Sequence, residues 1–401
     1  QVSLIGRKEV FSGKAKFGIF GDGKEVAQVA MARVFEKGDF RSGYYRDQTF
    51  MMALGLLTIE EFFAQLYAHA DLDADPASGG RQMTAHFATR SLDPDGSWRD
   101  LADRFNSASD ISPTGSQMPR LVGLAHASRL YRELDELRDR TKFSRAGNEI
   151  AFGTIGNASC AEGMFWEAVN AIGVLQAPAL ISVWDDGYGI SVPNENQMTK
   201  GSVSEALSGF RRTAEDPRGF EIRRVSGWDY PALVETYREV AATVRADHVP
   251  AIVHVVELTQ PQGHSTSGSH ERYKDADRLS WEADHDCVTR MRAWILEQGI
   301  ATAERLDAIE DEDRRRVLDL KDRAWARFRD ELVAERDELC GLLDTAASAS
   351  PDGRALTTVA DRLRRQPTPV RRDLFRAVSD ALVAARAAAP PVRAPLIAWR
   401  D

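Results

Sequence analysis

The sequence predicts an α/β fold: a doubly wound, mostly parallel sheet with helices on both faces, followed by a helical C-terminal extension. In the central part of the chain, short apolar runs alternate with segments of helical periodicity, and this alternation is typical of parallel sheets. The 401 residues, 43% of them hydrophobic, also suffice for one large domain or two ordinary ones.

Three apolar runs are the predicted buried strands. They span 149–156, 179–184 and 251–258, with helices predicted between them over 163–175 and 230–247. In a sheet of this kind, ligands bind beyond the carboxyl ends of the strands. The residues expected at that edge are Gly156, Asp185 and Thr259.

Two further helices are predicted around a long polar stretch. Apolar residues at helical spacing predict a helix over 58–69, and another is expected over 117–137. Residues 71–110 between them are rich in Asp, Gly, Pro and Ser and too long for an ordinary connection. We therefore expect a functional loop that covers the active site.

The composition changes beyond about residue 299. Glu, Asp, Arg and Ala predominate there at helical periodicity, and prolines cluster near the end. We therefore expect a main α/β domain over 1–300 and a helical extension and connector over 301–401.

Composition and charge exclude several classes of function. The formal charge of −9 makes nucleic acid an unexpected partner, and no apolar run approaches the roughly 20 residues of a membrane span. The three cysteines lie far apart without a CxxC pair, which argues against a zinc site or a disulfide framework. Such cysteine usage suits the cytoplasm, where we expect this protein.

Two turns carry the strongest chemical pattern. The small-residue turn Gly156-Asn157-Ala158 follows one predicted strand, and the run Asp-Asp-Gly-Tyr-Gly at 185–189 follows the next. Backbone N–H groups of such a turn can approach a diphosphate, while side-chain oxygens from both turns can meet on one Mg²⁺ ion.

These turns resemble the Gly-Asp-Gly and Asn-Asn motifs of thiamine-diphosphate enzymes, and the following Gly-Tyr is similar to the alpha chains of 2-oxo-acid dehydrogenases. The resemblance implies thiamine diphosphate and Mg²⁺ as cofactors, bound by the domain over 1–300. The metal ligands would be the side chains of Asn157 and Asp186 and the backbone carbonyl of Tyr188, with Gly156 and Ala158 beside the diphosphate.

The sequence departs from that family at three positions. Asn157 stands where Asp is usual, and Asp186 stands where Asn is usual. The sum of one carboxylate and one amide is unchanged. Trp184 occupies a place where some relatives have a phosphate-binding Arg.

Further segments resemble the alpha-chain pattern in the expected order. Tyr45 and Arg46 are similar to a pair that grips the diphosphate, and Arg is a fork-shaped donor suited to phosphate oxygens. Ser112 and the backbone of Thr114 would contact the thiamine. His264, in a Gly-His-Ser-Thr-Ser run, resembles the mobile-loop histidine that reaches the diphosphate and the reacting carbon.

The segment Gly-Arg-Gln-Met-Thr-Ala-His at 80–86 is more similar to the branched-chain enzymes than to the pyruvate enzymes. His86, the last residue of this segment, could have a functional role at the site or could order the loop by hydrogen bonds. The triplet Gly21-Asp22-Gly23 looks like a cofactor motif, but no buried strand precedes it, and we do not expect a metal site there.

The resemblance implies the decarboxylating component of a 2-oxo-acid dehydrogenase complex, which passes the acyl group to a lipoyl carrier. His264 would be a catalytic residue that handles a proton in that transfer. The implied partners are a 2-oxo-acid substrate, a lipoyl-bearing acyltransferase, and a beta subunit or beta half that supplies a Glu and forms a heterotetramer. The proline-containing connector suits a longer fused polypeptide.

Two alternatives stay open at this point. A carboligase of transketolase type uses the same cofactor but transfers to an aldehyde or ketone. A non-catalytic cofactor-binding subunit is suggested by Asn157 and Trp184.

Overall fold

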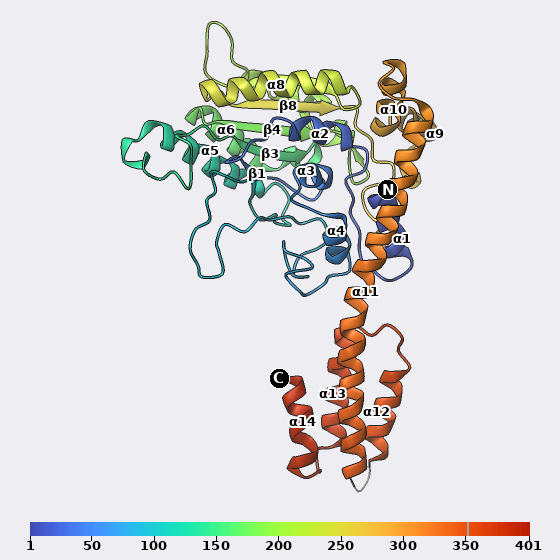
Figure 1. Ribbon diagram of the computed structural model, residues 1–401. Helices are drawn as coiled ribbons and strands as arrows, with labels where there is room; N and C mark the ends of the chain where they lie inside the picture. The colour runs from blue at the N-terminus through green and yellow to red at the C-terminus, as the bar shows by residue number, and fades with distance from the viewer. Residues whose placement is uncertain (351–352) are drawn as a thin grey trace. The chain divides into compact units, whose positions relative to one another are not determined.

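The computed structural model describes residues 1–350 and 353–401 of the chain (Figure 1). They form two compact units, Gln1–Asp319 and Leu320–Asp401. The boundary lies inside one long helix, α11 (Ala303–Ala349).

The first unit is built on a six-stranded sheet in which every pairing is parallel, with the order β2-β1-β3-β4-β8-β7. The predicted α/β class is therefore confirmed. The strands are β1 (Phe40–Ser42), β2 (Asn106–Ser107), β3 (Ala151–Gly156), β4 (Ala179–Trp184), β7 (Glu221–Ser226) and β8 (Ala251–Val256).

Three of these strands were not predicted. β1 and β2 are too short to show a pattern, and β2 lies inside the stretch expected to be a loop. β7 is an edge strand whose Arg223 and Arg224 are exposed, so it lacks a continuous apolar run.

Helices cover both faces of the sheet, as predicted (Figure 1). On one face, α5 (Gln117–Glu133) and α6 (Gly163–Leu175) share a buried apolar cluster with β3 and β4. On the other face, Ser182 of β4 is hydrogen-bonded to Tyr237 of α8 (Tyr230–Asp247), at 2.9 Å between the two oxygens. The same hydroxyl donates to Met31 of α2 (Glu25–Ala32).

Helices α6 and α8 have the predicted bounds, whereas two other predicted helices are shorter. α4 (Ile59–Leu66) ends early because Ala68 has a left-handed φ of 59°. α5 ends at Glu133 because Leu134 is extended, and a separate 3-10 turn follows.

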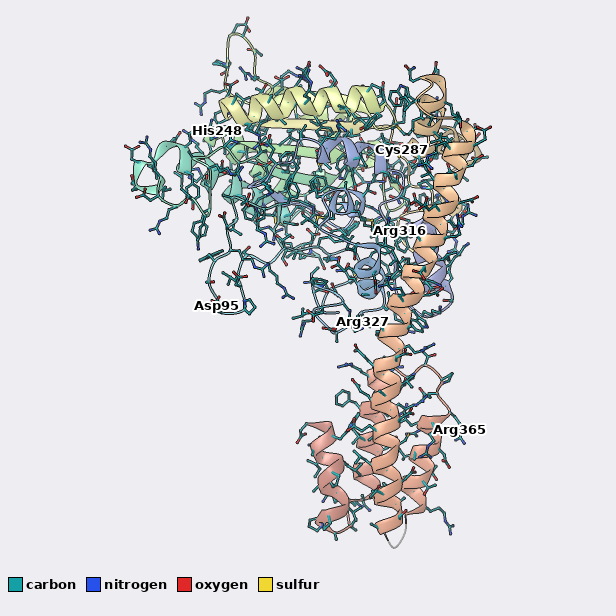
Figure 2. All side chains as sticks on the ribbon, in the orientation of Figure 1. Asp95, His248, Cys287, Arg316, Arg327 and Arg365 are labelled. Carbon is teal, nitrogen blue, oxygen red and sulfur yellow. The ribbon has the colours of Figure 1, made fainter. Side chains whose placement is uncertain are left out.

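The remaining helices of the first unit are α1 (Val2–Phe11), α3 (Gln48–Ala53), α7 (Val203–Ala206), α9 (Ala276–Asp284) and α10 (Cys287–Glu297). A small hairpin is formed by β5 (Tyr188–Gly189) and β6 (Val192–Pro193). Figure 2 shows the side chains of this unit, with Asp95 at the outer end of the polar stretch 71–110.

The second unit confirms the predicted helical C-terminal extension. Besides the end of α11 it contains α12 (Arg354–Arg364), α13 (Arg371–Ala384) and α14 (Pro390–Arg400). These helices enclose a buried apolar cluster of their own. None of the helices described is long and apolar enough to cross a membrane.

Candidate cofactor site

The two predicted turns lie side by side at the carboxyl ends of β3 and β4. Gly156 is the register partner of Trp184, and the backbone N–H of Asn157 donates to the Trp184 carbonyl at 3.2 Å. The amide nitrogen of Asn157 donates to the backbone carbonyl of Tyr188 at 3.1 Å. Ala158 begins the 3-10 turn that follows. The parallel pairing thus brings together the turns that the sequence separates.

Asp186 provides the negative charge of this cluster. Its Oδ1 accepts the backbone N–H of Tyr188 at 3.2 Å, and its Oδ2 lies 3.1 Å from the ammonium of Lys24. Burial alone would raise the pKa of Asp186, but the nearby Lys24 and Arg46 outweigh that effect and hold the pKa below its ordinary value. Asp186 is therefore ionised.

The neighbouring Asp185 has a different task. Its carboxylate accepts the backbone N–H of Gly187 at 2.9 Å and lies 2.8 Å from Nε2 of His254, while Nδ1 of His254 lies 2.9 Å from the hydroxyl of Ser204. Asp185 also accepts the side-chain amide of Asn194 at 2.9 Å. It therefore fixes the turn that presents Asp186.

The donor set fits a magnesium ion. Asn157, Asp186 and the Tyr188 carbonyl offer one amide, one carboxylate and one carbonyl, which Mg²⁺ can combine with phosphate oxygens and water. The amide nitrogen of Asn157 donates to the Tyr188 carbonyl at 3.1 Å and to Oδ1 of Asn194 at 2.6 Å, so a half-turn that placed the amide oxygen there would break both contacts. Among the described residues, no group of three or more His, Cys, Asp or Glu side chains is arranged to hold a metal ion.

Arg46 and His264 form a second cluster. The guanidinium of Arg46 is buried, donates to the Phe20 carbonyl, and reaches both Nδ1 and the carbonyl of His264 at 3.0 and 2.9 Å. Tyr45 packs edge-on against the His264 ring at 6.4 Å between centroids. Burial, followed by the charge of Arg46, lowers the pKa of His264 to about 4. The imidazole is therefore neutral at physiological pH.

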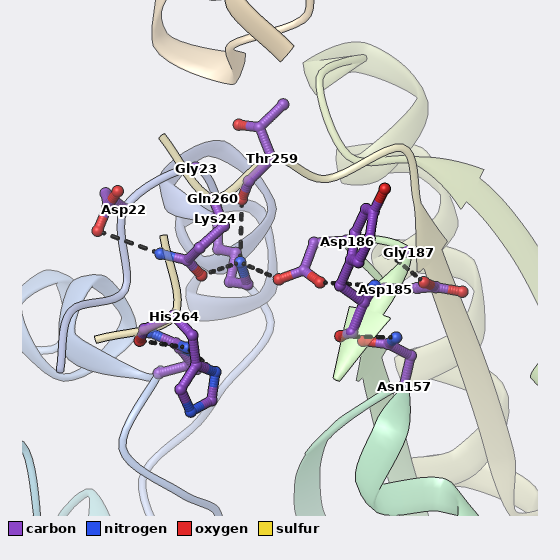
Figure 3. A network of polar contacts seen from close by, with 12 residues as sticks. Asp22, Gly23, Lys24, Asn157, Asp185, Asp186, Gly187, Thr259, Gln260 and His264 are labelled. Carbon is purple, nitrogen blue, oxygen red and sulfur yellow. Dashed lines mark hydrogen bonds and ion pairs between the residues drawn. The ribbon is translucent and has the colours of Figure 1, made fainter. Parts of the chain in front are cut away.

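The loop of His264 is tethered to the N-terminal segment. The backbone N–H of Thr266 donates to the Gly18 carbonyl at 2.9 Å, and the N–H of Gly18 donates to the Thr266 hydroxyl at 2.9 Å. His264 is thus held on the side of the site formed by residues near the start of the chain (Figure 3).

Ser112 and Thr114 lie on an exposed segment before α5. The hydroxyl of Ser112 lies 3.1 Å from Nε2 of His86, a residue of the polar stretch 71–110. Ser112 therefore contacts that stretch, and not Asn157 or Asp186. Gly115, at a φ of 77°, brings the segment close to the turn after Asn157, since an added Cβ would lie 3.3 Å from Cβ of Glu162.

The side chain of Trp184 takes no part in the polar cluster. It is fully buried, and its indole N–H donates to Asp47 at 3.1 Å. Asp47 also accepts from Arg41 at 2.7 Å. The indole therefore extends a buried polar network beneath the site and offers no cation to a phosphate.

Sequence analysis missed one functional candidate, Lys24. Its ammonium contacts Asp186, the Thr259 carbonyl and Gln260, and Figure 3 shows it between the two sides of the site. Asp22 accepts the backbone N–H of Gln262 at 3.0 Å. The triplet Gly21-Asp22-Gly23 therefore contributes to a contact between two loops. In the sequence, only the lysine that follows the triplet indicated a binding role.

One family and several known proteins are similar to this chain. The pattern of the family described as "Dehydrogenase E1 component" matches residues 5–329. The chain is 26% identical over 294 residues to the 2-oxoisovalerate dehydrogenase subunit alpha of Bacillus subtilis, covering 73% of this chain and 77% of that protein. The mitochondrial alpha subunits of Caenorhabditis elegans and Homo sapiens are 27% and 25% identical, over 76% and 78% of this chain. The alignments span 62% and 61% of these two relatives.

Proposed function

The chain belongs to the dehydrogenase E1 component family, a thiamine-diphosphate-dependent family, and from this membership we propose that it is the alpha component of a branched-chain 2-oxo-acid dehydrogenase. It would act in the oxidative decarboxylation of the 2-oxo acid and in the transfer of the acyl group to a lipoyl carrier. The observation that carries the proposal is the family match over residues 5–329, which includes every site residue described above.

Thiamine diphosphate, when bound, would supply a nucleophilic carbon and an electron sink for decarboxylation of the 2-oxo acid. We assign Asn157, Asp186 and the carbonyl of Tyr188 to a magnesium ion that accompanies the diphosphate. The backbone at Gly156 and Ala158 would approach the diphosphate, with Ser112 and Thr114 assigned to the thiamine. These assignments rest on the resemblance and on the chemistry of the donor set.

Arg46 and His264 have complementary tasks in this proposal. The positive charge of Arg46 favours a diphosphate, with Tyr45 packed beside it. The Nδ1 of His264 accepts from Arg46, so the proton of the neutral ring is on Nε2. His264 would transfer a proton through this N–H during acyl transfer.

A branched-chain substrate is supported by two observations. The relatives above are named for 2-oxoisovalerate, and the Arg-Gln-Met sequence at 81–83 is closer to that branch. The proposed partners are a beta subunit or beta half that completes the site, and a lipoyl-bearing acyltransferase. We also propose a cytoplasmic location, which suits three buried free cysteines.

A decarboxylation assay tests the function. The chain assembled with its beta partner should consume branched-chain 2-oxo acids with an artificial electron acceptor, and the isolated chain should not. Turnover by this chain alone at the rate of the assembly would contradict the need for a partner. Transfer to an aldehyde, without lipoyl acylation, would identify a carboligase instead.

A further inference from the structure

The assignments above leave one buried charge at the site without a role, the ammonium of Lys24. We propose that Lys24 is a built-in cation of the diphosphate site. It neutralises Asp186 in the free protein and supplies part of the positive charge that balances the diphosphate, which makes cofactor binding less dependent on a divalent metal ion. This inference rests on the proposed function.

The position of the ammonium is built by the protein. Lys24 is 1% exposed, and its Nζ donates to Asp186 at 3.1 Å, to the Thr259 carbonyl at 3.0 Å and to Gln260 at 2.8 Å. An ammonium has three donors, so all are used. A buried charge is costly unless it is paired and hydrogen-bonded, and these contacts meet that requirement.

Two loops hold each other around this lysine. Gly23 has a φ of 83°, and a Cβ at this position would lie 2.2 Å from the Thr259 carbonyl oxygen, so only glycine permits this approach. Asp22 accepts the backbone N–H of Gln262 at 3.0 Å and the side chain of Gln260 at 3.3 Å. The loops therefore fix Gln260, which in turn orients Lys24.

The ion pair changes the charge that the site offers to a metal. Asp186 is the one carboxylate among the three candidate ligands, and Lys24 balances it, so the ligands and Lys24 together carry no net charge. A divalent cation on Asp186 would be repelled by the ammonium, because like charges a few ångströms apart interact strongly in a partly buried site. The pair of Lys24 and Asp186 thus adds no net negative charge that would repel a diphosphate, and the ammonium of Lys24 and the guanidinium of Arg46 both attract it.

Calorimetric titration of thiamine diphosphate into the chain assembled with its beta partner tests this. One series contains saturating Mg²⁺ and the other EDTA. The unmodified assembly should bind in both, with an affinity in EDTA no more than about 100-fold lower, the scale of one or two charge-assisted contacts. Lys24→Met should lose at least about tenfold more affinity in EDTA than in Mg²⁺. Lys37→Met, which breaks an exposed lysine pair with Asp103, is the matched control and should change neither series.

The outcomes separate the two proposals. If the unmodified assembly does not bind even with Mg²⁺, the proposed function and the role of Lys24 both fail. If it binds with Mg²⁺ but not in EDTA, or if Lys24→Met loses affinity equally in both series, the role of Lys24 alone is wrong. Should Lys24→Met not fold, the titration of the unmodified assembly in EDTA still tests the role of Lys24, because failure to bind there would show that role to be wrong.

Discussion

The guanidinium of Arg46 lies 3.0 Å from Nδ1 of His264, and because arginine has no acceptor, this ring nitrogen must accept. The contact selects one tautomer of the neutral imidazole and, together with burial, keeps the ring uncharged. Burial contributes more than Arg46 to the lowering of the His264 pKa to about 4.

This pKa predicts how stability depends on pH. An unfolded histidine titrates near 6.5, so from about pH 6.5 down to about pH 4 the unfolded chain binds a proton that the folded chain does not. The contribution of neutral His264 to the free energy of unfolding is fully present above pH 6.5 and is lost as the pH falls towards 4. Urea unfolding at about pH 7 and about pH 5 should show a smaller loss for His264→Asn than for the unmodified chain. Equal losses of stability in the two proteins would mean that groups other than His264 cause the pH dependence.

The role assigned to His264 predicts a partition between two steps. His264→Ala should slow acyl transfer to the lipoyl carrier more than decarboxylation, because the histidine is assigned to the later step. Single-turnover measurements of both steps with the assembled protein distinguish them. His126→Ala, on α5, serves as the control. Losses of the same size in both steps would contradict the assignment.

The exchanged ligands predict an ordered series of variants. Asp186→Asn removes the only side-chain carboxylate of the proposed metal set and leaves the ammonium of Lys24 without its ion pair, so metal-dependent cofactor binding should fall by more than tenfold, about 1.4 kcal/mol. Asn157→Asp with Asp186→Asn restores one carboxylate and should bind within roughly tenfold of the unmodified protein. Titration of thiamine diphosphate at fixed Mg²⁺ measures both.

Asn157→Asp alone places two carboxylates near the diphosphate, where like charge should offset part of the gain in metal affinity. Unchanged binding by Asp186→Asn would show that Asp186 is not a ligand.

The contacts of Asp185 predict a structural effect on the site. His254→Leu leaves the buried Asp185 carboxylate and the Ser204 hydroxyl without their shared partner, so it should destabilise the fold by about 2–4 kcal/mol. His254→Gln, which keeps a hydrogen-bonding side chain, should cost less. Urea unfolding of both variants checks the order, and a smaller cost for leucine would mean that the network does not stabilise the turn.

Local sequence patterns were sufficient for the centre of the fold. The strands β3, β4 and β8 are continuous apolar runs, and the apolar residues of α6 and α8 recur at helical spacing, so the local pattern of each segment indicates that it is buried. Because ligands gather where parallel strands end, the placement of the two turns after β3 and β4 side by side also followed from the sequence.

Tertiary structure alone decided what the adjacent Asp185 and Asp186 do. In the sequence they are equivalent members of one turn, but one pairs with His254 of β8 and the other with Lys24 near the start of the chain. Lys24 and Asp186 are 162 residues apart, and no periodicity links them. Hydrophobic patterning reports whether a segment is buried, whereas the partner of a buried charge depends on which distant loops the packed sheet brings within hydrogen-bonding distance.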